Sequence, residues 1–151
     1  MSGFRLPRGG DGIDRSQPLT FRYNGRTLQG FAGDTLASAL LANGVSIVGR
    51  GFKYHRPRGV IGTGFAETNA LVQLGEGAAL TPNVPATLIP LREGLVASSP
   101  TGWPSTRIDL GRLNDRLAAL LSAGFYYKTF IWPNWHWFEP FIRRAAGFGT
   151  A

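Results

Sequence analysis

The 151-residue chain contains no cysteine and two histidines. Without cysteine it cannot form disulfides, bind zinc or iron–sulfur clusters through thiolates, or use a thiol nucleophile. His55 and His136 lie far apart in the sequence, and neither belongs to an HExxH motif. There is no GxSxG motif, and the nine acidic residues form no pair with a spacing typical of glycosidases or two-metal sites. We therefore expect no catalytic residues and no metal site of its own in this chain.

Long apolar runs are also missing. No stretch approaches the roughly 18 apolar residues of a membrane span, and the N-terminal sequence MSGFRLPRGGDGIDRS has no signal-like apolar core. These absences predict a cytoplasmic protein without a membrane partner.

Acidic residues are outnumbered by basic ones, 9 against 16, which gives a net charge of +7. Such a surplus favours anionic partners, which include nucleic acids, phosphorylated cofactors and acidic protein surfaces. The chain is rich in glycine and proline, but its 43% hydrophobic content is sufficient for a core. Length and composition together predict one compact domain with irregular ends.

Local patterns predict a β-hairpin followed by a helix. Pro18–Phe31 alternates apolar and polar residues around Asn24-Gly25, the dipeptide best suited to a type I′ turn. The next segment, GDTLASALLANG, has leucines at helical spacing, a glycine after its end, and either Asp34 or Thr35 as its N-cap.

The strands expected after this helix are Val45–Val48, Asn69–Gly75, Ala86–Leu91 and Gly94–Ser98. A hairpin, one helix and further strands predict an α+β fold of the β-grasp type, in which a mixed ferredoxin-like sheet packs on a single helix.

The two ends of the chain have a different character. Residues 1–17 show no apolar periodicity and are expected to form an arm before a β-grasp domain at 18–99. Residues 100–151 are broken by prolines, with a short amphipathic helix predicted at Leu113–Leu121 and ten aromatic residues between Phe125 and Phe148. So many aromatics favour an extension that packs on a partner domain or subunit.

The segment GRGFKYHRPRGV is strongly basic, contains two aromatic residues and has no acid. Three interpretations are open: a solvated loop, a nucleic-acid patch, or a cluster that contacts a cofactor phosphate or a subunit. No RNP-like, KH or zinc-finger motif supports nucleic acid. The nearby GTGFAETN lacks the third glycine of a dinucleotide loop. The candidate contact residues are Arg50, Lys53, His55, Arg56 and Arg58.

Longer segments carry a resemblance to a known family. GDTLASALLANGVSIVGRGFKYHRPRG, ETNALVQLGEGA, PNVPAT, NDRL, AGFYYKTFIWP and EPFIRRAAGFG resemble the N-terminal region of the α subunit of heterotetrameric sarcosine oxidase, from about Arg5 to Gly149. The resemblance implies a domain similar to plant-type [2Fe-2S] ferredoxins, which are β-grasp proteins.

Relatives among the amine and amino-acid dehydrogenases have cluster cysteines spaced C-x4-C-x2-C, with a fourth further on. Alignment of their Pro-Arg-Gly with residues 57–59 places the cluster positions at Gly62, Glu67, Ala70 and Thr87. None of these residues can bind iron as a thiolate, so the resemblance implies a cluster loop without a cluster.

In that family the α subunit continues into NAD-binding and folate-binding domains, and the β subunit carries FMN and FAD. The complex converts sarcosine, tetrahydrofolate and O2 to glycine, methylenetetrahydrofolate and H2O2. This chain has no GxGxxG motif, so the resemblance implies an assembly domain without a cofactor of its own. Its partners would be the remainder of the α subunit and the β, γ and δ subunits.

Two origins fit such a chain: a fragment of a full α subunit, or a separately encoded small subunit. The alternative function is a free-standing anion- or nucleic-acid-binding module that uses residues 50–58. The position of these residues beside the cluster loop favours an internal anion or a subunit contact over nucleic acid.

Overall fold

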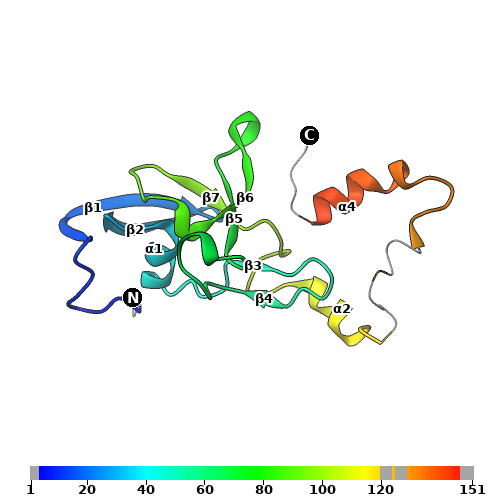
Figure 1. The fold of residues 1–151 in the computed structure, drawn as a ribbon, viewed down its shortest axis with the longest axis horizontal. Helices are drawn as coiled ribbons and strands as arrows, with labels where there is room; N and C mark the ends of the chain where they lie inside the picture. Colours follow the sequence, from blue (N-terminus) through cyan, green and yellow to red (C-terminus); the bar gives the residue numbers. More distant parts are fainter. Residues whose placement is uncertain (1–3, 120–123, 125–128, 147–151) are drawn as a thin grey trace.

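The computed structural model describes residues 4–119, 124 and 129–146 (Figure 1). Its main feature is a five-stranded sheet in the order β2-β1-β7-β5-β6. Strands β1 and β7 are parallel and the other neighbours are antiparallel. A mixed sheet with one packed helix confirms the predicted α+β, ferredoxin-like fold. The strands are β1 (Asp14–Tyr23), β2 (Arg26–Ala32), β5 (Leu71–Leu74), β6 (Thr81–Pro85) and β7 (Val96–Ser98).

The predicted hairpin is confirmed. Strands β1 and β2 pair in continuous register from Pro18 opposite Phe31 to Tyr23 opposite Arg26. Asn24 and Gly25 have φ angles of 50° and 74°, both in the left-handed region that a type I′ turn requires. The first strand begins at Asp14 rather than Pro18, and its register shifts between these two residues.

The predicted helix is α1 (Leu36–Ala42), and its N-cap is Thr35. The Ser38 N–H donates to the Thr35 hydroxyl at 3.2 Å, while the Ser38 hydroxyl accepts from the Thr35 N–H at 3.0 Å. This reciprocal capping box satisfies two N–H groups at the start of the helix. The buried face of α1 packs into a core shared with the sheet, whose largest completely buried apolar side chains are Phe21, Leu36, Leu40, Val48 and Val72.

The later strands are predicted only in part. Asn69–Gly75 and Gly94–Ser98 contain β5 and β7, so these two predictions are confirmed. Val45–Val48 was wrong as a strand, because only the following residues pair, as β3 (Gly49–Arg50) with β4 (Pro57–Arg58). Burial of Val48 in the core explains its apolar character instead.

The prediction for Ala86–Leu91 was also wrong. This segment begins with a 3-10 helix, η3 (Ala86–Leu88), and the strand is the preceding β6. The sequence analysis predicted no strand at β6, which contains Pro82 and Pro85. Since β6 is an edge strand, the missing proline N–H groups are tolerated there.

The C-terminal part contains short helices on the side of the molecule opposite the β1–β2 hairpin (Figure 1). The α-helix α2 (Leu113–Arg116) is shorter than the predicted Leu113–Leu121, because the chain leaves helical geometry at Leu117. The last two residues of that prediction, 120 and 121, lie outside the described residues. The other elements are η1 (Gly64–Ala66), η2 (Gly77–Ala79), η4 (Leu110–Arg112), η5 (Trp135–Trp137) and α4 (Glu139–Ala145). Within the described ranges no helix has the length and apolarity of a membrane span.

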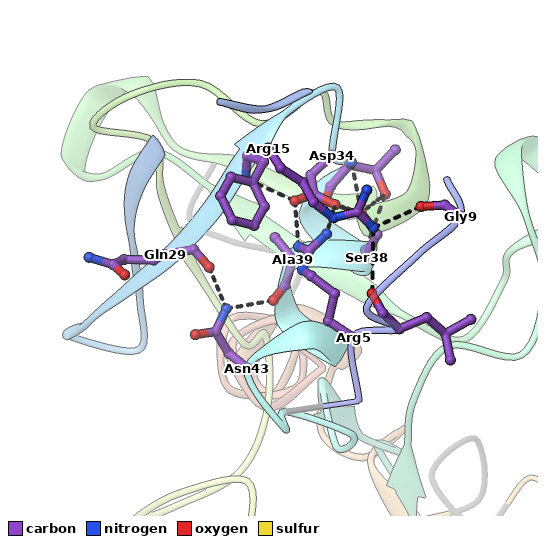
Figure 2. Close-up of polar contacts among 11 residues, drawn as sticks. Arg5, Gly9, Arg15, Gln29, Asp34, Ser38, Ala39 and Asn43 are labelled. Atoms are coloured by element: carbon purple, nitrogen blue, oxygen red, sulfur yellow. Dashed lines mark hydrogen bonds and ion pairs between the residues drawn. The ribbon is translucent and has the colours of Figure 1, made fainter. Parts of the chain in front are cut away.

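The N-terminal arm is tied to the hairpin and to α1 through the buried carboxylate of Asp34 (Figure 2). The Arg5 guanidinium donates to both Asp34 oxygens, at 2.6 and 3.3 Å, and lies 5.0 Å from the centre of the Phe31 ring. The Ser38 hydroxyl and the Phe31 N–H donate to the same carboxylate at 2.7 and 2.9 Å. Burial would raise the pKa of Asp34, but these donors outweigh burial and lower the pKa.

Replacement of Asp34 by alanine should destabilise the chain by about 3 kcal/mol, since it leaves the Arg5 guanidinium and the part-buried Phe31 N–H without their acceptor. Urea denaturation of the variant at neutral pH measures this loss. Asp11→Ala is the matched control, because Asp11 is an exposed residue of the same arm. Equal midpoints for the two variants would contradict the anchoring role of Asp34.

Candidate functional site

Three of the four predicted cluster positions, Gly62, Glu67 and Ala70, lie in one loop, which we call the Glu67 loop (residues 59–70). Glu67 directly follows η1, and its side chain is almost completely buried, with 2% of the residue exposed. One carboxylate oxygen, Oε2, accepts from the N–H groups of Ile61 and Gly62, both at 2.8 Å. The other, Oε1, accepts from Asn69 at 2.5 Å and Ala70 at 2.8 Å. Glu67 thus braces the two ends of its own loop.

The electrostatics of Glu67 follow from these contacts. Burial would raise the pKa of its carboxyl group, but the N–H groups of Gly62, Ala70, Asn69 and Ile61 stabilise the charged form more strongly and lower the pKa to about 2. The group is therefore a buried anion at any pH near neutrality.

The fourth predicted cluster position, Thr87, lies against the same loop. Its hydroxyl donates to the carbonyl oxygen of Gly64 at 2.8 Å, which connects η3 to η1. The structure therefore brings Gly62, Glu67, Ala70 and Thr87 to one place. Their correspondence to cluster ligands stays a prediction.

These residues do not fit an iron–sulfur cluster. The chain has no thiolate, and the one carboxylate at the site is occupied by four N–H donors. In the part of the chain that the structure describes, no three His, Cys, Asp or Glu side chains are grouped to hold a metal ion.

In the neighbouring basic loop (residues 50–58), the side chains of Arg50 and His55 form polar contacts inside the molecule. Arg50 is 4% exposed. Its Nε donates to the carbonyl of Thr106 at 2.7 Å, and its two terminal nitrogens donate to the carbonyls of His55 at 3.0 Å and Arg107 at 3.3 Å. Arg50 therefore joins the basic loop to the segment 101–112 instead of facing a ligand.

His55 is held in the same network by Asp109, a residue that the sequence analysis missed. The His55 Nδ1 lies 2.7 Å from Asp109 Oδ2, while Asp109 Oδ1 accepts from the N–H groups of Trp103 and Gly111 at 3.0 and 3.2 Å. Burial would raise the pKa of Asp109, but the N–H of Trp103 and the His55 and Gly111 contacts lower it. The local Asp-x-Gly turn is visible in the sequence, whereas the partner His55 lies 54 residues away.

Three of the predicted contact residues, Lys53, Arg56 and Arg58, lie closer to solvent. Lys53 and Arg56 both lie over the ring of Tyr54, at 4.8 and 5.0 Å from its centre. Arg56 also forms an exposed ion pair with Asp115 at 3.1 Å, and Arg58 is exposed on β4.

Arg58 lines a groove of about 540 Å³ between the β3–β4 pair and α4. Asn69, which also donates to Glu67, reaches the groove from the Glu67 loop. Arg143 and Glu139 line it from α4 and pair with one another at 3.7 Å. The groove thus places exposed positive charge next to the Glu67 loop.

Acid should destabilise the chain through Glu67. The folded-state pKa of about 2 lies below the ordinary value of 4.5, so the stabilisation is complete above pH 4.5 and is lost as the pH falls toward 2. Denaturant unfolding at pH 7, 4 and 3 measures this slope, and Glu67→Gln should reduce it. If both proteins lose stability equally between pH 4.5 and 3, Glu67 does not cause the acid sensitivity.

Gly111→Ala should cost about 1–3 kcal/mol, because a Cβ at this position would collide with the His55 ring. Hydrogen exchange should increase at residues 101–112 and in the basic loop. Gly12→Ala is the control, since a Cβ there meets no atom within 4 Å. Unchanged exchange in both segments of Gly111→Ala would contradict the proposed link between them.

Comparisons with known proteins identify the family of the chain. The family described as 2Fe-2S iron-sulfur cluster binding domain matches residues 16–102. The "Sarcosine oxidase subunit alpha" of Rhizobium meliloti (strain 1021) is 56% identical over 154 residues, covering 100% of this chain and 16% of that protein. The protein of the same name from Corynebacterium sp. (strain U-96) is 39% identical over 93 residues, covering 60% of this chain and 10% of that protein.

The chain thus spans only 16% of the length of its Rhizobium relative. Among solved structures, L-proline dehydrogenase from P. horikoshii matches with a TM-score of 0.44 and 22% identity, over 61% of this chain and 17% of that one. The family match covers more than half of the chain, which therefore belongs to the 2Fe-2S iron-sulfur cluster binding domains, as a member without cysteines that is similar over its whole length to the Rhizobium meliloti sarcosine oxidase α subunit.

Proposed function

We propose that this chain is a structural and assembly domain of a sarcosine oxidase α-subunit-like protein, with no catalytic residues of its own. The observation that carries the proposal is the buried Glu67 carboxylate at the aligned cluster positions of a domain similar over its whole length to that subunit. A carboxylate held by four N–H donors cannot carry electrons, so the domain keeps the scaffold and loses the redox centre.

The assembled complex would oxidatively demethylate sarcosine, with tetrahydrofolate and O2 as co-substrates and glycine, methylenetetrahydrofolate and H2O2 as products. Other parts of the complex would bind FAD, FMN, NAD and tetrahydrofolate. The partners of this chain would be the rest of the α subunit, the β subunit, and the γ and δ subunits. This part of the proposal follows from the resemblance to the relatives and from the name that they carry.

Exposed apolar side chains support an assembly role. Trp132, Trp137 and Phe141 in the C-terminal extension are 84%, 73% and 76% exposed, and Phe65 on the Glu67 loop is 90% exposed. Large aromatic residues seldom face solvent in such numbers, and they are typical anchors of protein interfaces. In this proposal, the extension 100–151 and the rim of the Glu67 loop pack on partner domains or subunits.

The exposed cations of the basic loop would supply the polar part of the contact. Lys53, Arg56 and Arg58 are proposed to face a partner subunit or a flavin phosphate. Arg50 and His55, which bond within the chain, would hold the loop in position. Arg58 has the most favourable position, because it lines the groove beside the Glu67 loop.

A free-standing nucleic-acid-binding module is less well supported. The guanidinium of Arg50 and the ring of His55 are engaged inside the chain, and Arg56 is paired with Asp115. The purified chain should show no shift of DNA or RNA at about 100 mM salt. Tight binding that weakens steeply with salt would replace the assembly proposal with the nucleic-acid one.

Arg58→Glu in the assembled oxidase tests the assembly role of the basic loop. Charge reversal at an interface should weaken association of the subunits, or retention of flavin, by at least about tenfold. Size-exclusion chromatography and flavin absorbance measure these two outcomes. The control is Arg92→Glu, an equal charge change at an exposed residue outside the basic loop. Unchanged assembly and unchanged flavin content in Arg58→Glu would overturn this assignment.

A further inference from the structure

We propose that the Glu67 loop is an anion-binding site made of main-chain N–H groups, selective for a small carboxylate, and that the chain fills this site with its own Glu67 side chain. The inference concerns the chemistry of the loop alone and does not depend on the proposed function.

The main-chain N–H groups of the Glu67 loop form a complete set of donors for one carboxylate. Each oxygen of the Glu67 carboxylate accepts two N–H groups, from Ile61 and Gly62 on one side and from Asn69 and Ala70 on the other. An ionised carboxylate offers about four lone-pair sites, so the four donors saturate it.

The negative charge of Glu67 is compensated by main-chain N–H groups and not by a cationic side chain. Within the described residues, no arginine, lysine or histidine forms an ion pair with Glu67. The buried negative charge is stabilised by N–H dipoles, as in the backbone nests that bind phosphate and other anions. A ring of donors repels a cation, so the site excludes metal ions and favours an anion.

Contacts independent of the Glu67 carboxylate hold the four N–H donors in position. The Asn69 side-chain amide donates to the Gly59 carbonyl at 3.1 Å. The Ala86 N–H donates to the Ala70 carbonyl at 2.9 Å. At Gly62, a Cβ would lie 2.9 Å from the Ala66 carbonyl oxygen, so only glycine allows this close approach. The donors should therefore keep their positions after the Glu67 side chain is removed.

Glu67→Ala in the 151-residue chain creates the vacancy that tests this site. We expect a melting temperature at least about 5 °C below that of the unaltered chain. Sodium formate, added at constant ionic strength and pH 7, should raise the melting temperature of this variant saturably, and sodium chloride should not. Formate should have no such effect on the unaltered chain.

Glu76→Ala is the matched control, because it removes the same charge from an exposed turn residue whose ion pair with Arg22 is long, at 3.8 Å. It should lose little stability and show no response to formate. If formate and chloride act equally on Glu67→Ala, or if the two variants lose equal stability, the loop is not an anion site and the proposal is overturned.

A measurement on the unaltered chain covers the case in which Glu67→Ala does not fold. In an NMR titration, the amide protons of Ile61, Gly62, Asn69 and Ala70 should lie downfield and should shift together as the Glu67 carboxylate is protonated. Movement of the four amides in step with the Glu67 carboxyl carbon supports the site. Four amides that do not follow this carbon would overturn it.

Discussion

The Glu67 carboxylate accepts hydrogen bonds from four main-chain N–H groups of the loop at the candidate site. Such part-buried N–H groups need acceptors, since unpaired donors are costly away from water. Glu67 supplies these acceptors from within the loop. Through Asn69, the same arrangement positions one wall of the groove that Arg58 also lines.

Two other buried carboxylates act in the same way elsewhere in the chain. Asp34 binds the N-terminal arm to the hairpin and α1, and Asp109 binds the segment 101–112 to the basic loop. The chain has 21 glycines, 10 prolines and short elements of regular structure. In such a chain, buried acceptors replace part of the hydrogen bonding that longer helices and strands would supply.

Hydrogen bonds and ion pairs inside the chain also change the interpretation of the basic loop. By composition it is the most cationic segment of the chain, and its aromatic residues are compatible with nucleic-acid binding. In the structure, Arg50 and His55 stabilise the fold, and Arg58 faces the groove. The loop is thus better suited to one local contact with a partner or an anionic cofactor than to a long polyanion.

Elements that depend on neighbours along the chain could be predicted from the sequence. The Asn24-Gly25 turn, the capped helix α1 and the strands β5 and β7 follow from local backbone preference and apolar periodicity. The family resemblance also identified the positions that meet at the Glu67 loop.

Only the tertiary structure decided which strand lies at an edge and which charges are neutralised. The edge position of β6 permits its prolines. The bonds of Arg50 to Thr106 and of His55 to Asp109 join residues 56 and 54 positions apart. The role of Glu67 could not be predicted either, because the sequence around a glutamate in a glycine-rich loop is the same whether its side chain faces solvent or its own backbone. Burial and partner geometry are set by the folding of distant segments around a residue, and no local pattern encodes them.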